Sequence, residues 1–105
     1  MSADDFRVAV QRLLTQVGHW ENPRWAATAS SGAGPRGELV HGLVQRLADL
    51  GADAEHRPHR EVPRQPDMVL PDQLRVMADD LLTAEAGDDL LTAAAKEVLA
   101  VREAL

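Results

Sequence analysis

The chain has 105 residues and a mass of 11.4 kDa, with 45% hydrophobic residues, 27% charged residues and a formal net charge of −6. This length fits a single domain over residues 1–105 and argues against a two-lobed enzyme with a cleft between the lobes. The sequence contains no cysteine, which excludes disulfides, thiolate metal sites and cysteine nucleophiles.

The start of the chain, Met1 to Asp5, has neither the basic nor the apolar region of a signal peptide, and no apolar run approaches the length of a membrane span. We therefore expect a soluble cytoplasmic protein with no membrane partner. Alanine and leucine are abundant, isoleucine and tyrosine are absent, and Lys96 is the only lysine beside ten arginines. The scarcity of strand formers favours an all-α fold, and the arginine excess is typical of a GC-rich bacterial genome.

The first helix is predicted over residues 2–17. Ser2 is a suitable N-cap, and Asp4 and Asp5 lie in the first turn, where the helix dipole favours carboxylates. Gly18 is expected to end the helix. The apolar residues recur at spacings of three and four and so share one face: Phe6, Val10, Leu13, Leu14 and Val17.

Residues 18–34 form a connection longer than the usual helix-to-helix link of about 2 to 8 residues. It holds both tryptophans, Trp20 and Trp25, with Arg24 between them. They either cover one end of the helical bundle or anchor a ligand or partner, since Trp and Arg are frequent at binding hot spots. The glycine-containing segment that follows is predicted to be a flexible linker. It leads to a helix N-terminus, where an anion can bind, but it lacks a P-loop sequence.

The second helix is predicted over residues 35–50, with Pro35 in its first turn and Gly51 as its left-handed cap. Its apolar residues occupy more than a narrow stripe, so we expect it to touch more than one neighbour. They are Leu39, Val40, Leu43, Val44, Leu47 and Leu50.

Residues 52–70 form a second long connection, and its polar part places His56, His59 and Arg60 among glutamates, prolines and further arginines. A lone His-x-x-His pair lacks the other ligands of a zinc site, and the arginines repel a cation, so no metal site is predicted. We expect a solvated, partly extended loop. The alternative is that it contacts an acidic partner or the acidic half of its own chain.

The last two helices are predicted over residues 71–86 and 88–104, joined by a tight antiparallel turn at Gly87. Residues 79–84 recur as 88–93, a repeat that we attribute to the low diversity of the sequence. The acidic residues around this turn do not have the spacing of a calcium loop. Residues 65–105 carry the whole net charge of −6, which disfavours a nucleic-acid partner.

These patterns predict an all-α fold, a compact four-helix bundle with up-down connectivity and two long loops. In that topology the two loops lie at opposite ends of the bundle. The predicted core is Phe6, Val10, Leu13, Val17, Leu39, Leu43, Leu47, Leu74, Met77, Leu81, Leu91, Val98 and Val101.

For function, the sequence favours a non-enzymatic protein-interaction module that associates with itself or with another protein. The width of the second helix's apolar set, the Trp loop, and the position of Leu90 and Leu99 off the main apolar stripe motivate this hypothesis. No nucleophile motif or triad is recognisable, so no catalytic residue and no cofactor are predicted. The alternative is a small-molecule or anion-binding protein. The candidate binding residues are Trp20, Arg24, Trp25, His56, His59 and Arg60.

Overall fold

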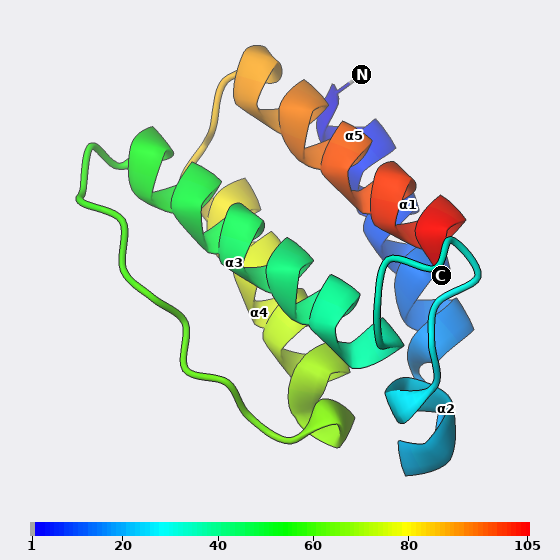
Figure 1. Cartoon of the computed structure of the whole chain (residues 1–105). Coiled ribbons are helices and arrows are strands. Elements are labelled where there is room, and N and C mark those ends of the chain that lie inside the picture. The colour runs from blue at the N-terminus through cyan, green and yellow to red at the C-terminus, as the bar shows by residue number, and fades with distance from the viewer. Residues whose placement is uncertain (1) are drawn as a thin grey trace.

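The structure, a computed structural model, describes residues 2–105, and Figure 1 shows how its helices are arranged. The four long helices are α1 (Ser2–Val17), α3 (Arg36–Ala54), α4 (Leu70–Thr83) and α5 (Asp88–Ala104). Two short elements lie in the connections, namely α2 (Asn22–Ala26) and the one-turn 3-10 helix η1 (Asp67–Val69). The predicted all-α fold is confirmed, with no strand in this part of the chain. None of these helices is long and apolar enough to cross a membrane.

The long helices begin where the sequence places helix-starting residues. Carboxylates occupy the first turn of α1 and of α5, where they face the positive end of the helix dipole. Pro71 lies in the first turn of α4, where a missing backbone N–H costs nothing. The predicted bounds of α1 and α5 are therefore confirmed, whereas the ends of the two middle helices differ from the prediction.

Gly51 does not cap α3, as the sequence had led us to expect; the helix continues through it to Ala54. The left-handed residue at the end is instead His56, with φ of 56°. The N–H of Arg57 donates to the carbonyl of Ala52 at 2.8 Å, and the N–H of His56 donates to that of Asp53 at 3.2 Å. These two bonds form a Schellman motif that closes the helix, so one predicted binding residue has a structural role in the backbone.

The turn between α4 and α5 also differs from the prediction. Helix α4 ends at Thr83 rather than at residue 86, and Glu85 takes the left-handed conformation with φ of 55°. Gly87 has extended backbone angles and precedes the first turn of α5 as its N-cap residue.

The predicted up-down order of the bundle is wrong. Helix α1 packs on α5 and α4, and α3 packs on α4 and α5. Of the long helices that follow one another in the sequence, α3 and α4 are therefore neighbours, whereas α1 and α3, and likewise α4 and α5, lie diagonally across the bundle. Figure 1 shows that α1 and α5 run in the same direction and that α3 and α4 also run in the same direction. Because α3 and α4 are parallel, the chain must return along the whole bundle between them.

This return is made by residues 55–66, which we call the strap (Figure 1). The strap leaves the end of α3 and runs back in an extended conformation to the start of that same helix. There Arg64 Nε lies 3.1 Å from Glu38 Oε1, and Arg64 Nη2 lies 2.5 Å from Asp67 Oδ1. The length of the second loop is thus required by the parallel pairing of α3 and α4.

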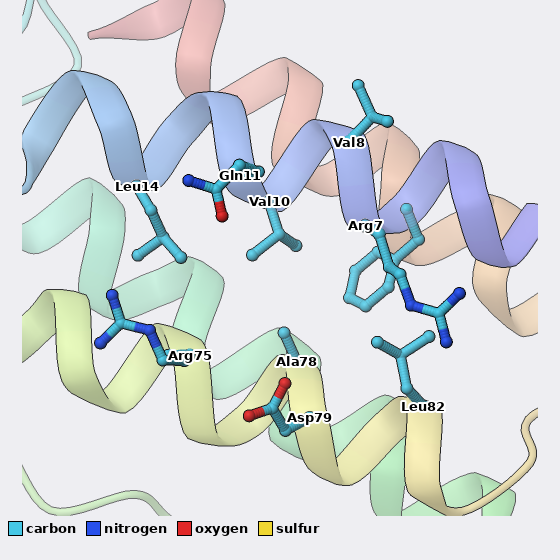
Figure 2. A pocket seen from close by; sticks show the side chains of 10 residues that line it. Arg7, Val8, Val10, Gln11, Leu14, Arg75, Ala78, Asp79 and Leu82 are labelled. Atoms are coloured by element: carbon cyan, nitrogen blue, oxygen red, sulfur yellow. The ribbon is translucent and has the colours of Figure 1, made fainter.

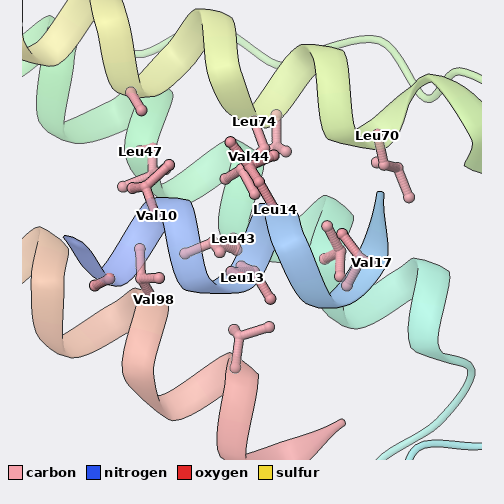
Figure 3. Packing of buried hydrophobic residues seen from close by; sticks show 14 of the residues in the cluster. Val10, Leu13, Leu14, Val17, Leu43, Val44, Leu47, Leu70, Leu74 and Val98 are labelled. Atoms are coloured by element: carbon pink, nitrogen blue, oxygen red, sulfur yellow. The ribbon is translucent and has the colours of Figure 1, made fainter. Parts of the chain in front are cut away.

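The core lies where the four long helices meet, and Figure 3 shows its aliphatic side chains interdigitating from all four. The predicted core residues are buried except for Leu39 and Met77, which are only partly buried. Helix α3 packs on α2, α4 and α5, as its wide apolar set predicted. Four residues of that set are buried inside the molecule, and Leu39 and Leu50 are partly buried, so most of the set is used in internal packing.

Candidate functional site

The two tryptophans form a lid at one end of the bundle. Trp25 is completely buried, and Trp20 is 6% exposed. Their ring centroids are 5.0 Å apart at an interplanar angle of 74°, an edge-to-face contact. The guanidinium of Arg36 lies 5.4 Å from the centroid of the Trp20 ring. The first of the two interpretations of the Trp loop, a cover over the bundle end, agrees with this burial.

Arg24 is the exposed member of the predicted Trp site. Its carbonyl accepts a hydrogen bond from Arg36 Nη1 at 3.3 Å, and its side chain borders a shallow depression beside Trp20 and Pro23. With Trp25 sealed in the core, any contact at this end of the molecule involves the rim of the lid rather than the rings themselves.

The glycine-containing segment after α2 is held against the end of α5 and is not the free linker we had expected. The N–H groups of Ser30 and Ser31 donate to the carbonyls of Leu105 and Ala104 at 3.0 and 3.1 Å. Gly32 and Gly34 supply the positive φ angles, 76° and 129°, that this path requires. These backbone donors satisfy carbonyls at the end of α5 and are not available to an anion.

The His/Arg segment forms the first half of the strap. His59 Nε2 lies 2.7 Å from Asp53 Oδ1, and Nδ1 lies 3.8 Å from Asp49 Oδ1. The hydrogen bond to Asp53 raises the pKa of His59 above its usual value. Desolvation of the ring lowers the pKa, and the negative charges of Asp53 and Asp49 raise it further. His59 is thus a latch between the strap and the exposed side of α3.

Gln45 fixes the middle of the strap from below. Its Nε2 donates to the carbonyl of Arg60 at 2.9 Å, and its Oε1 accepts from the N–H of Val62 at 2.7 Å. Val62 is the buried residue of the strap, 8% exposed, and it joins the hydrophobic core. A cavity of about 270 Å³ lies under this part of the strap, floored by Leu47 and Met77.

The two predicted groups of binding residues are not brought together. The tryptophans lie at the end of the bundle where α3 begins, whereas His56 and His59 lie near the end where α3 finishes. Helix η1, which follows the strap in the chain, contacts α2 beside the lid. The cavity beside Trp20 contains neither His56 nor His59 in its lining, and the cavities beside the strap contain neither tryptophan.

A surface that the sequence did not single out lies around α1. One groove, of about 450 Å³, runs between α1 and α4, and a second, of about 440 Å³, runs between α1 and α5. Val8 lines both grooves and is 48% exposed, and Figure 2 shows it pointing away from α4. Leu99, 44% exposed, lies on the α5 side. We call this surface the α1 face: Asp5, Arg7, Val8, Gln11, Arg12, Arg75, Asp79, Lys96 and Leu99.

The residues that line the two grooves of the α1 face include more cationic than anionic side chains. Four of its side chains are cationic and two are anionic, although the chain has a net charge of −6. Arg7 and Arg75 pair with Asp4 and Asp72 one helical turn away, at 3.3 and 3.1 Å. Arg12 and Lys96 form no ion pair with any residue that the structure describes.

The signal that could have found this face is an apolar residue away from the helix stripe. Leu99 lies partly off the apolar stripe of its helix, and it is 44% exposed in the structure. Val8 is a second such residue, between Phe6 and Val10 and outside the buried set.

A scan of the chain against models of protein families gave no match, and neither did searches of curated proteins and of solved structures.

Proposed function

We propose that this protein is a non-enzymatic interaction module that associates with a second copy of itself through the α1 face. The observation that supports the proposal is the exposure of Val8 and Leu99 around two grooves that no segment of the described chain covers. Exposed apolar side chains rimmed by charged ones are typical of protein interaction sites.

The opposite side of the bundle gives the contrast. There the strap crosses α3 and places Val62 over the apolar residues beneath it. The chain thus covers its own apolar surface on one side with an extended segment, while α1 has no such cover. A second copy supplies that cover and leaves the fold unchanged.

The test is sedimentation velocity of the purified chain from roughly micromolar to millimolar concentration. The wild type is expected to shift from monomer to dimer as concentration rises. Val8→Asp and Leu99→Asp are each expected to weaken the dimer about tenfold or more, because a carboxylate in an apolar contact loses its hydration.

Val76→Asp is the matched control, since Val76 is 52% exposed on α4 and lines neither groove. It introduces the same charge and is expected to dimerise like the wild type. A wild type that stays monomeric throughout, or an equal loss in the Val76→Asp variant, would overturn the proposal.

The second candidate function is binding of a small anion under the strap. The cavity there is lined by Arg57 and Arg60, by the carboxylates of Glu55, Glu61 and Asp80, and by apolar residues of α3 and α4. Arg57 pairs with Glu55, whereas Arg60 has no ion-pair partner in the described chain and is the group left to bind an anion. Phosphate and hexanoate are the probes. Each is tested for a rise in melting temperature that is lost in Arg60→Gln, and no shift with either probe would remove this candidate.

A further inference from the structure

The exposed side of α1 has acidic residues near its N-terminus and a basic residue farther along the helix. Reading along the helix, Asp4 and Asp5 come first, Val8 lies in the middle, and Arg12 follows, and all four side chains are exposed. Val8 is three or four residues away from each of the other three, so all four lie along one side of the helix. Acid, apolar and basic groups therefore follow one another over two turns, about 12 Å of helix.

This order is complementary to itself when a second helix runs in the opposite direction. A two-fold axis through Val8 places Val8 against the partner copy's Val8 and places the acidic end of each helix against Arg12 of the other. Two identical ion-pair sites then flank one apolar contact, as the symmetry of a homodimer requires. A parallel pairing instead places Arg12 on Arg12 and acid on acid, which repel.

The surroundings of α1 favour the same arrangement. Lys96 lies on α5 across the groove from Asp5 and Arg12, and it adds a second unpaired cation at this face. The Asp4 carboxylate pairs with Arg7, but their side chains are 72% and 60% exposed, so this pair is weak and does not compete strongly with a partner. Leu99 provides an apolar rim against which the partner helix can pack.

From this pattern we infer that two copies of the chain meet through antiparallel α1 helices, with Val8 on the two-fold axis and Asp4 or Asp5 of each copy opposite Arg12 of the other. The inference rests on the proposed self-association and specifies its geometry. The alternative occupants, a parallel second copy or an acidic helix of another protein, are separate outcomes of the test below.

The absence of cysteine makes the geometry directly testable by single-cysteine cross-linking. Val8→Cys is expected to form a disulfide-linked dimer under mild oxidation, because a residue on the axis faces its own copy. Val76→Cys is the matched control, with similar exposure on α4, and is expected to cross-link at least about tenfold more slowly. An equimolar mixture of Asp4→Cys and Arg12→Cys is expected to give mainly the mixed dimer.

A charge-exchange experiment tests the same geometry without oxidation. Asp4→Arg and Arg12→Asp each place like charges at both ion-pair sites, and each alone is expected to weaken the dimer about tenfold. When the two variants are mixed, both sites become Arg against Asp, so native mass spectrometry is expected to show the heterodimer in excess over either homodimer. Circular dichroism checks that each variant keeps its helix content.

The outcomes separate the geometry from the function on which it rests. Arg12→Cys cross-linking to itself faster than Val8→Cys would replace the antiparallel arrangement with a parallel one. A dimer that is sensitive to Val8→Asp but shows no preference in cross-linking or mixing would overturn the geometry and leave the proposed function standing. A chain that is monomeric at every concentration, with Val8→Cys no faster than Val76→Cys, would overturn both and leave an acidic partner helix as the occupant to test.

Discussion

Two sides of this small bundle treat apolar surface in opposite ways. Over α3, the strap is fixed by Gln45, by the His59 latch and by the Arg64 ion pairs, and it buries Val62. Over α1, nothing in the described chain covers Val8, although it is the same residue type as Val62. Apolar surface that another segment of the chain covers is structural, whereas apolar surface left uncovered, as at Val8, is a candidate binding surface.

The largest expected effect comes from removing the clamp under the strap. Gln45→Ala leaves the N–H of Val62 and the carbonyl of Arg60 without their partner, and we expect a loss of about 2 kcal/mol in the free energy of unfolding. Urea denaturation measures it. Gln11→Ala on the bare side is the control, since Gln11 is exposed, and its change is expected to stay within about 0.5 kcal/mol. Equal losses would remove the contrast between the two sides.

The paired valines give the next effect. Val62→Ala deletes two buried methyl groups and is expected to cost about 1.5 kcal/mol. Val8→Ala deletes the same groups from a half-exposed site and is expected to change the stability of the monomer by less than about 0.5 kcal/mol. Both are measured by urea denaturation at low concentration, where dimers do not contribute. A cost at Val8 as large as at Val62 would show that the α1 face is already covered.

Gly51 and Gly37 lie near the two ends of α3, the helix along which the strap runs. Gly51 is helical with open space at the position of a Cβ atom, so Gly51→Ala is expected to stabilise the fold by about 0.5 to 1 kcal/mol. Gly37 is buried against the Asp67 carboxylate, and Gly37→Ala must displace that group. Thermal melting is expected to show opposite signs for the two substitutions, and a destabilising Gly51→Ala would contradict the helical assignment.

The smallest effect is the pH dependence of the His59 latch. The pKa of His59 is raised in the folded state, so its stabilising contribution is fully present below its unfolded value of 6.5 and is lost as the pH rises through the folded value. The melting-temperature difference between wild type and His59→Asn is therefore expected to shrink from about pH 5.5 to about pH 8.5. His19→Asn, away from the strap, is the control. A difference that grows with pH would contradict the latch.

Local sequence indicated which residues of the candidate sites are unusual, but it did not indicate what they contact. Concentration of Trp20 and Trp25 in one connection indicated a special role, but only their burial distinguishes a lid from a binding anchor. His59 was a candidate because of its polar neighbours, and its partners Asp49 and Asp53 come from α3, which the strap folds back upon. Burial and folding back are properties of the three-dimensional arrangement, so neither could be obtained from spacing along the chain.

The helices and their buried faces follow from local patterns in the sequence. Periodicity of three and four, acidic first turns and proline positions are local, because each reports on residues within one or two helical turns. This is why α1, α5 and most of the core were predicted from the sequence. Three features emerge only in the folded chain: which helices are neighbours, the parallel run of α3 and α4 beside the strap, and the exposure of Val8. These features depend on contacts between residues far apart in the chain, and an apolar stripe does not specify which element will cover it.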